Sequence, residues 1–144
     1  MTPEQKVVHV LLVDDDDVDV QAVQRAFRKT KIANPMHVAR DGIEALAMLR
    51  GEDGHKPVPR PYIIILDLNM PRMDGLEFLA EIRRDPVHHD AVVFVMTTSK
   101  ADEDRAASYD RNVAGYIVKS EVGEGFLKVT EMLDSYWRIV LLPS

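Results

Sequence analysis

The sequence contains no cysteine, which excludes a disulfide framework, a thiol nucleophile and a thiolate metal site. It also has no excess of basic residues. Its net charge is −6, whereas a protein that neutralises the phosphates of nucleic acid needs a basic face. The chain has no apolar run of about 18 residues, so we expect no membrane span. Its start, MTPEQKVVHV, lacks the basic and apolar regions of a signal peptide, and we therefore expect a cytoplasmic protein.

The length of 144 residues predicts one domain, which we place at residues 1–138, followed by an apolar tail at 139–144. A domain of this size buries roughly 68–70% of the surface of its unfolded chain, so it needs no covalent cross-links. With 46% hydrophobic and 29% charged residues, the composition is that of an ordinary globular protein.

Apolar runs that suit buried strands alternate with segments whose apolar residues recur at helical spacing. The expected strands are residues 7–13, 36–40, 62–68, 91–97 and 114–119. The expected helices are residues 18–32, 41–51, 74–84, 102–111 and 124–139. We expect Asp74 to cap the third of them. Strands that are apolar throughout and alternate with helices indicate a parallel sheet covered on both faces. With right-handed crossovers, the pattern predicts a doubly wound α/β fold with five strands and five helices.

Polar residues stand where four of the expected strands end: the pair Asp14 and Asp15, then Asp67, Thr97 and Lys119. In doubly wound folds, ligands bind beyond the carboxyl ends of the strands. Two carboxylates about 4 Å apart there would repel each other by about 4 kcal/mol at an effective dielectric constant near 20. A Mg²⁺ ion would relieve this repulsion, and a lysine and a hydroxyl suit phosphoryl oxygens. The pattern therefore favours phosphoryl transfer onto a carboxylate.

The acidic run DDDDVD continues beyond this pair into the next expected helix. Asp16 and Asp17 follow the strand, and we expect them to cap the helix. Asp19 falls in the first helical turn, where a negative charge suits the helix dipole, and it has capping-box spacing from Asp16. We therefore predict that only Asp14 and Asp15 take part in the chemistry.

The segments LLVDDDD, LDLNMPRMDG, VMTTS and AGYIVK resemble the signature motifs of the receiver domains of response regulators, the signalling proteins of two-component systems. The resemblance runs from about Val7 to Trp137. It implies a flavodoxin-like sheet with strand order 2-1-3-4-5. It also implies a signalling phosphoacceptor that catalyses only its own phosphorylation and dephosphorylation.

By this resemblance, Asp67 is the phosphoacceptor, which attacks the phosphohistidine of a sensor histidine kinase. Asp15 would bind Mg²⁺ directly and Asp14 through water, and Asp67 itself would be a ligand. Asn69 would offer its backbone carbonyl to the same ion. The resemblance therefore assigns the magnesium site and the acceptor to one pocket.

The resemblance also assigns a switch. Thr97 would follow the phosphoryl oxygens, Lys119 would form an ion pair with them, and Tyr116 would turn inward once Thr97 moves. One feature departs from the family pattern: receivers usually have a cis proline after the lysine, and here Ser120 follows. A non-proline cis bond costs about 2.5–4 kcal/mol, so we expect a trans bond and a rebuilt loop.

Three features resemble those of stand-alone regulators that are paired with phytochrome-type sensor kinases: a long loop at residues 52–61, the segment TTS at the end of the fourth expected strand, and the ending SYWRIVLLPS. The partner implied is a sensor histidine kinase such as a bacteriophytochrome, and the output is protein contact or phosphorelay. The tail contains four successive apolar residues, Ile139, Val140, Leu141 and Leu142. Docked on a second copy, they would make an isologous homodimer.

Two alternatives remain open. The block DDDDV also fits the motif of haloacid-dehalogenase-type phosphatases, with Asp14 as the nucleophile and Asp16 as the general acid. A receiver fold that binds a partner without being phosphorylated is the second alternative. His88 and His89 beside Asp90 suggest a metal site at first sight, but we interpret them as surface residues of a polar loop.

Overall fold

The computed structural model describes residues 8–29, 34–68, 70, 72–97 and 113–118. Within them, five strands form one parallel sheet in the order β2-β1-β3-β4-β5. The strands are β1 (His9–Val13), β2 (Met36–Ala39), β3 (Tyr62–Asp67), β4 (Val92–Thr97) and β5 (Gly115–Val118). The predicted doubly wound sheet and its strand order are confirmed, with strand limits within two residues of those expected from the sequence.

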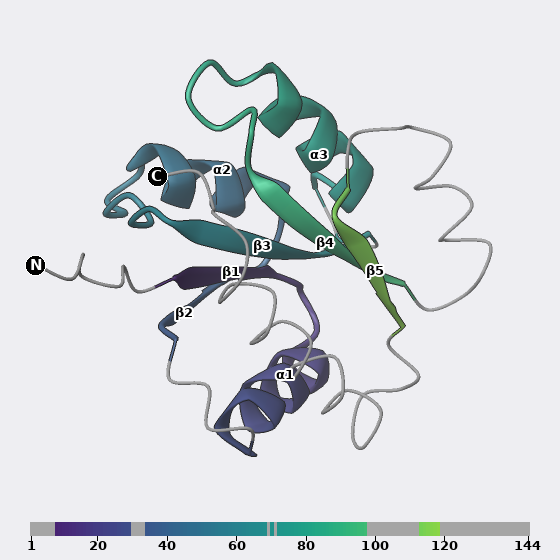
Figure 1. Ribbon diagram of the computed structural model, residues 1–144. Coiled ribbons are helices and arrows are strands. Elements are labelled where there is room, and N and C mark those ends of the chain that lie inside the picture. The colour runs from purple at the N-terminus through teal and green to yellow at the C-terminus, as the bar shows by residue number, and fades with distance from the viewer. Residues whose placement is uncertain (1–7, 30–33, 69, 71, 98–112, 119–144) are drawn as a thin grey trace, which may run out of the picture.

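Three helices lie among the described residues: α1 (Asp17–Lys29), α2 (Gly42–Arg50) and α3 (Gly75–Arg84). Helix α1 covers one face of the sheet, whereas α2 and α3 cover the other (Figure 1). The helices expected at 102–111 and 124–139, and the tail at 139–144, lie outside the described residues. None of the three helices above is long and apolar enough to cross a membrane.

Strand alternation divides the core into two layers. Leu11 and Ile64 point toward α2 and α3, whereas Leu12 and Ile63 point toward α1. Because β1 and β3 are central strands covered on both faces, all four of these side chains have no exposed surface. This burial explains why the sequence of β3 is apolar in every position up to its last residue, Asp67.

The helices begin where short polar side chains satisfy their first N–H groups. Asp16 accepts a hydrogen bond from the backbone N–H of Val18 at 2.8 Å, which confirms its predicted capping role. Asp74 caps α3 as predicted and forms a capping box with Glu77. The C-terminal end of α2 is set by Gly51, which adopts a left-handed conformation with φ of 72° and stops the helix.

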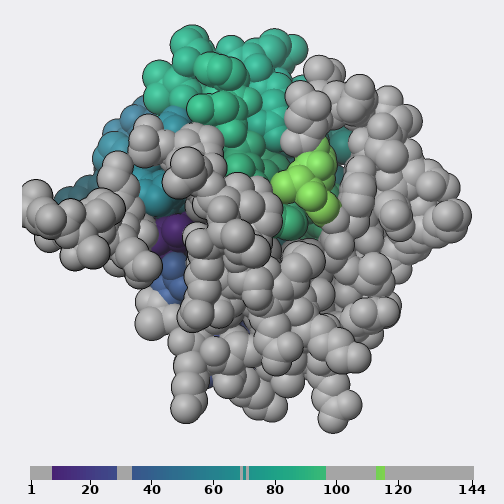
Figure 2. Space-filling view, viewed as in Figure 1, coloured from purple at the N-terminus to yellow at the C-terminus, as the bar shows by residue number. Residues whose placement is uncertain are grey.

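The segment between α3 and β4 contains a buried histidine, whereas we expected all of its polar residues to lie at the surface. On the face shown in Figure 2, α3 and this segment form one continuous green region. Within it, His88 is buried with 7% of its surface exposed, and its Nδ1 lies 2.6 Å from the hydroxyl of Tyr62. The interpretation of His88 as a surface residue was therefore wrong, because the first residue of β3 provides a buried partner for the imidazole. His89 and Asp90 are exposed, as expected.

Candidate functional site

Two buried carboxylates lie side by side at the carboxyl edge of the sheet. Strands β1 and β3 are paired in register, with Val13 opposite Leu66, so Asp14 and Asp67 follow at the ends of neighbouring strands. Asp14 has no exposed surface and Asp67 has 3%. The backbone N–H of Asp14 donates to the carbonyl of Ala39 in β2 at 2.9 Å, which extends the strand pairing to the site itself.

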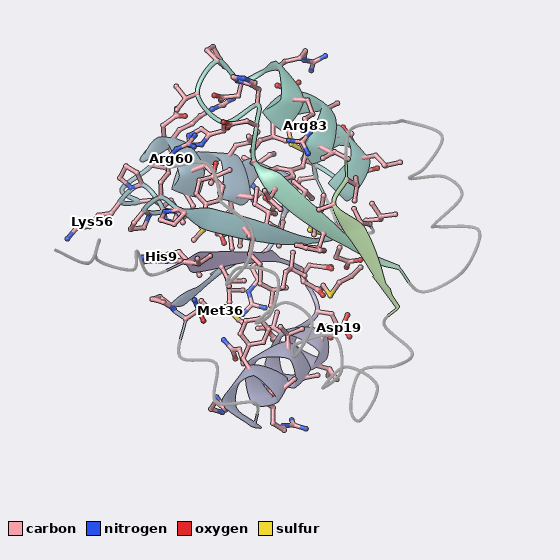
Figure 3. The ribbon with its side chains drawn as sticks, viewed as in Figure 1. His9, Asp19, Met36, Lys56, Arg60 and Arg83 are labelled. Atoms are coloured by element: carbon pink, nitrogen blue, oxygen red, sulfur yellow. The ribbon has the colours of Figure 1, made fainter. Side chains whose placement is uncertain are left out.

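A third carboxylate joins this pair from α1. Asp14, Asp19 and Asp67 each bring one carboxylate oxygen to within 4.8 Å of the others. Asp19 is half-buried and lies in the first turn of α1, at the opposite end of the sheet from His9 (Figure 3). We call these three residues the carboxylate cluster. At a dielectric constant near 20, two full charges at this separation repel each other by roughly 3–4 kcal/mol.

The donor set of the carboxylate cluster fits a hard divalent cation. Magnesium, calcium and manganese ions prefer carboxylate oxygens, and Mg²⁺ commonly uses a small number of carboxylates and completes its shell with water and phosphate oxygens. Three oxygens this close, two of them from buried residues, lose much of their mutual repulsion when such an ion binds. The predicted pairing of Asp14 with Asp67 is therefore observed, and Asp19 is added to it.

The other predicted site residues stand as follows. Asp15 is exposed and is not among the three carboxylates that the structure brings together. Thr97 ends β4 and pairs with Val118, and Tyr116 pairs with Val95, but the side chains of Thr97 and Tyr116 are not described. Asn69 and Lys119 lie outside the described residues. The roles of these five residues remain predictions.

The turn that follows Asp67 depends on Gly75. The backbone N–H of Gly75 donates to the carbonyl of Leu68 at 3.0 Å, which closes the turn at the start of α3. A Cβ atom on Gly75 would lie 2.5 Å from the carbonyl oxygen of Asp67 and 2.7 Å from Cα of Leu68. Glycine is therefore required here because the helix starts in direct contact with the backbone of Asp67.

The turn between β2 and α2 borders the site on its other side. Asp41 is buried, and its Oδ1 accepts from the backbone N–H of Glu44 at 2.9 Å, capping α2. Its Oδ2 accepts from Nε of Arg72 at 2.7 Å, and Arg72 comes from the loop after Asp67. Arg40, one residue earlier, forms an ion pair with Asp17 at 2.5 Å, although both side chains are exposed.

The opposite, amino edge of the sheet holds a separate polar network. Burial lowers the pKa of His88, although the nearby Asp85 carboxylate acts in the other direction. Burial raises the pKa of Tyr62 to about 12. Burial alone would raise the pKa of Asp85, but hydrogen bonds from the backbone of Val87 and His88 and from Arg50 outweigh it, so the pKa is lowered. These groups lie at the far ends of the strands from Asp67, which separates them from the carboxylate cluster.

Sequence reasoning missed the place of Asp19 in the carboxylate cluster. A signal was nevertheless present, because Asp19 precedes Val23 by four positions and Phe27 by eight, and so shares their face of the helix. Val23 and Phe27 are buried against the sheet. A carboxylate on that stripe, in the turn nearest the end of β1, points toward the sheet edge.

Known proteins resemble this chain in both sequence and structure. The response regulator Rcp1 of Synechocystis sp. is 37% identical over 136 residues, which cover 94% of this chain and 92% of Rcp1. A crystal structure of the phosphorylated cyanobacterial phytochrome response regulator RcpA matches 94% of this chain and 98% of that one, with a TM-score of 0.81 and 36% identity. The Mn²⁺-bound form of Rcp1 matches 96% of this chain and all of its own, with a TM-score of 0.79 and 36% identity.

The family comparison covers the same region as the fold and the site. The model of the response regulator receiver domain matches residues 10–130, which include β1 from its second residue, the other four strands and every member of the carboxylate cluster. The matched region contains both the acidic residues at the strand ends and the strands that form this sheet order. The match therefore favours a signalling receiver over a haloacid-dehalogenase-type phosphatase. This chain belongs to the response regulator receiver domain family.

Proposed function

We propose that this chain is a single-domain response regulator that accepts a phosphoryl group on Asp67 from the phosphohistidine of a sensor histidine kinase. One observation carries the proposal. The carboxylate of Asp67, at the end of a central strand, lies within 4.8 Å of the carboxylate oxygens of Asp14 and Asp19. A nucleophilic carboxylate next to a site for a divalent cation is the arrangement that phosphoryl transfer to an aspartate requires.

We propose Mg²⁺ as the physiological cation, held by Asp14 and Asp67, with Asp19 as a further direct or water-mediated ligand. Asp15 and the backbone carbonyl of Asn69 would complete the site, as the family resemblance implies. When bound, the ion neutralises charge on the carboxylates and on the phosphoryl oxygens. The related Rcp1 has a Mn²⁺-bound form, which supports the binding of a divalent ion by this chain.

In the proposed transfer, a carboxylate oxygen of Asp67 attacks the phosphorus atom of the phosphohistidine. The P–O bond forms as the P–N bond breaks, and the imidazole nitrogen keeps the electron pair of the broken bond. The product is an acyl phosphate on Asp67. Attack by water on its phosphorus atom breaks the same P–O bond and returns the carboxylate and inorganic phosphate.

The remaining residues have proposed roles after transfer. Lys119 forms an ion pair with the phosphoryl oxygens, Thr97 moves toward them, and Tyr116 turns inward as Thr97 leaves its place. The register supports one common location, because Asp67 pairs with Met96, and Thr97 pairs with Val118, the residue before Lys119.

The chain would act as one domain over residues 1–138 and signal by protein contact or phosphorelay. RcpA is a cyanobacterial phytochrome response regulator, which supports a phytochrome-type sensor kinase, such as a bacteriophytochrome, as the partner. We also propose a homodimer that uses the tail at 139–142. Deleting residues 139–144 would then halve the mass measured by sedimentation equilibrium, and an unchanged mass would remove the tail from the interface.

Phosphorylation by a small-molecule donor tests the central proposal. The full chain, incubated with acetyl phosphate and Mg²⁺, should gain the mass of one phosphoryl group in intact-protein mass spectrometry. Asp67→Asn should gain none, whereas Asp17→Asn, a change at an exposed carboxylate near the site, should behave like the wild type. If Asp67→Asn is still phosphorylated and Asp14→Asn is not, the phosphatase alternative is correct. A wild-type chain that neither gains the phosphoryl group nor binds beryllofluoride with Mg²⁺ is a receiver-like binding module.

A further inference from the structure

We infer that Arg72, through its ion pair with Asp41, is a positioning residue that sets the affinity of the carboxylate cluster for its divalent cation. The inference rests on the proposed function, because the cation belongs to it. It assigns a role in the site to a residue outside the carboxylate cluster, on the basis of the contacts between two turns of the chain.

Hydrogen bonds to both of its oxygens fix the position of the Asp41 carboxylate in this ion pair. Both oxygens of Asp41 are used: Oδ1 accepts from the backbone N–H of Glu44 at 2.9 Å, and Oδ2 accepts from Nε of Arg72 at 2.7 Å. A second nitrogen of the same guanidinium, Nη2, also contacts Oδ2. The Asp41 side chain is only 5% exposed. A buried carboxylate fixed by a helix start gives Arg72 a partner with one defined position.

A second contact holds the neighbouring residue of the same loop. The backbone N–H of Gly42 donates to the carbonyl of Met73 at 3.1 Å. A Cβ on Gly42 would lie 2.7 Å from Cγ of Met73 and 2.9 Å from Cβ of Phe78. Two successive residues, 72 and 73, are therefore attached to two successive residues, 41 and 42.

The loop held in this way is part of the proposed cation site. It begins immediately after Asp67 and contains Asn69, whose backbone carbonyl is a proposed ligand. Its two ends are joined by the hydrogen bond from Gly75 N–H to the Leu68 carbonyl. That bond fixes the ends of the loop, and the Arg72–Asp41 pair fixes a point between them. Small changes in ligand position lower metal affinity because the ligands no longer fit one coordination geometry.

The backbone of Arg72 supports a role for its side chain. Its φ of 62° lies in the left-handed region, which glycine and asparagine adopt most readily. An arginine in this conformation is strained, and the surrounding contacts offset that strain. The conformation alone does not favour arginine, whereas the guanidinium makes a specific contact with Asp41.

The turn between β2 and α2 also contacts the other acidic segment. The carbonyl of Ala39 accepts from the backbone N–H of Asp14 at 2.9 Å, and Arg40 forms its ion pair with Asp17. Residues 39–42 thus contact the segment after β1 and the segment after β3. The pairing of β1 with β3 fixes Asp14 relative to Asp67, and Arg72 attaches the loop that follows Asp67 to this turn.

Cation titration of the full chain tests the inference. Arg72→Asn removes the ion pair but keeps a residue that tolerates the left-handed backbone, and Arg72→Lys keeps the charge. The matched control is Arg50→Asn, which removes a similar ion pair, Nε of Arg50 to Oδ2 of Asp85 at 3.0 Å, at the opposite edge of the sheet. Calorimetry measures the dissociation constant of Mg²⁺ for each protein, and thermal unfolding in EDTA measures the stability without cation.

We expect Arg72→Asn to bind Mg²⁺ about 10-fold more weakly than the wild type. Arg72→Lys should recover part of this loss, and Arg50→Asn should bind as the wild type does although its melting temperature falls. Equal affinity in Arg72→Asn and the wild type would overturn the positioning role. So would an equal weakening in Arg72→Asn and Arg50→Asn, because lost stability alone would then explain it. If the wild type itself binds no Mg²⁺, the proposed function fails as well.

Discussion

Asp19 in the first turn of α1 and Asp67 at the end of β3 bring carboxylate oxygens within 4.8 Å of each other. The two residues come from different layers of the fold, since α1 covers one face of the sheet and β3 lies at its centre. Hydrophobic packing of α1 against the sheet places Asp19 there, because Val23 and Phe27 on the same stripe are buried. Burial of apolar surface thus offsets the repulsion between these carboxylates.

Asp19→Asn should separate the stability of the fold from its affinity for the cation. Removing one of three close negative charges should raise the melting temperature in EDTA, since each full-charge pair at this separation costs roughly 3–4 kcal/mol at a dielectric constant near 20. The same change should weaken Mg²⁺ binding by about 10-fold. Thermal unfolding with and without Mg²⁺ measures both effects, because a bound cation stabilises the folded state.

The control for this experiment is Asp17→Asn, two positions earlier on the same helix. Asp17 is exposed and pairs with Arg40, so its loss should change the melting temperature little and leave the Mg²⁺ response intact. An unchanged response of Asp19→Asn to Mg²⁺ would show that Asp19 is not part of the cation site. A lower melting temperature in EDTA would show that repulsion within the carboxylate cluster is not the main effect of Asp19 on stability.

Gly75→Ala should destabilise the protein and disturb the acceptor. The new methyl group would lie 2.5 Å from the carbonyl oxygen of Asp67, so the backbone of one residue or the other must move. We expect a loss of about 1–3 kcal/mol in the free energy of unfolding and slower phosphorylation by acetyl phosphate. Urea denaturation and mass spectrometry measure the two effects.

The comparison for this prediction is Gly54→Ala. A Cβ on Gly54 meets nothing within 4 Å, although the φ of 82° makes alanine unfavourable by about 1–2 kcal/mol. Both variants should therefore lose stability, but only Gly75→Ala should phosphorylate more slowly. If phosphorylation slows equally in the two, the contact between Gly75 and Asp67 is not the cause.

His88 should make stability depend on pH below neutrality. Burial lowers the pKa of its imidazole from 6.5, so the unfolded chain binds the proton more readily than the folded chain does. Its contribution to stability is then fully present above about pH 6.5 and is lost as the pH falls toward the lower, folded pKa. The melting temperature should fall as the pH is lowered from about 7.5 to about 5.5. His88→Gln should make the melting temperature depend less steeply on pH in this range.

His89→Gln provides the reference, because His89 is an exposed neighbour and its substitution should leave the slope unchanged. His37 contributes in the same direction as His88, since burial and the nearby His9 lower its pKa, so some slope should remain in His88→Gln. A slope for His88→Gln as steep as that of the wild type would contradict the assignment.

Asp74→Ala should weaken the start of α3 without touching the carboxylate cluster. Asp74 accepts from the backbone N–H of Glu77 at 2.9 Å and completes a capping box with it. Its loss should lower the free energy of unfolding by about 1 kcal/mol in urea denaturation. Gln21→Ala, at an exposed position within α1, is a surface reference that should change less. Equal losses would mean that the capping box contributes little.

Local patterns predicted the elements because each of them depends on neighbouring residues. The apolar run that ends at Asp67 predicted β3, and the buried strand follows it to the last residue. Asp74 and Asp16 were predicted to cap helices, because the requirement for an acceptor at a helix start is local, and both do so. The position of Asp14 beside Asp67 followed from the parallel order of the strands.

Features that depend on how distant segments pack were not predicted. Asp19 was interpreted through the helix dipole because its location depends on how α1 docks on the sheet. His88 was interpreted as a surface residue because only the fold brings Tyr62 to it. The Arg72–Asp41 pair joins two turns that the sequence does not relate to each other.

The burial of β1 and β3 has a consequence for where movement occurs. Residues Val10–Val13 and Ile63–Leu66 have no exposed surface, so their amides should be among the slowest in the molecule to exchange with deuterium. Asp14 and Asp67 are anchored to these strands. A signal that starts with the proposed phosphorylation of Asp67 would therefore be transmitted by segments that move while β1 and β3 stay in place.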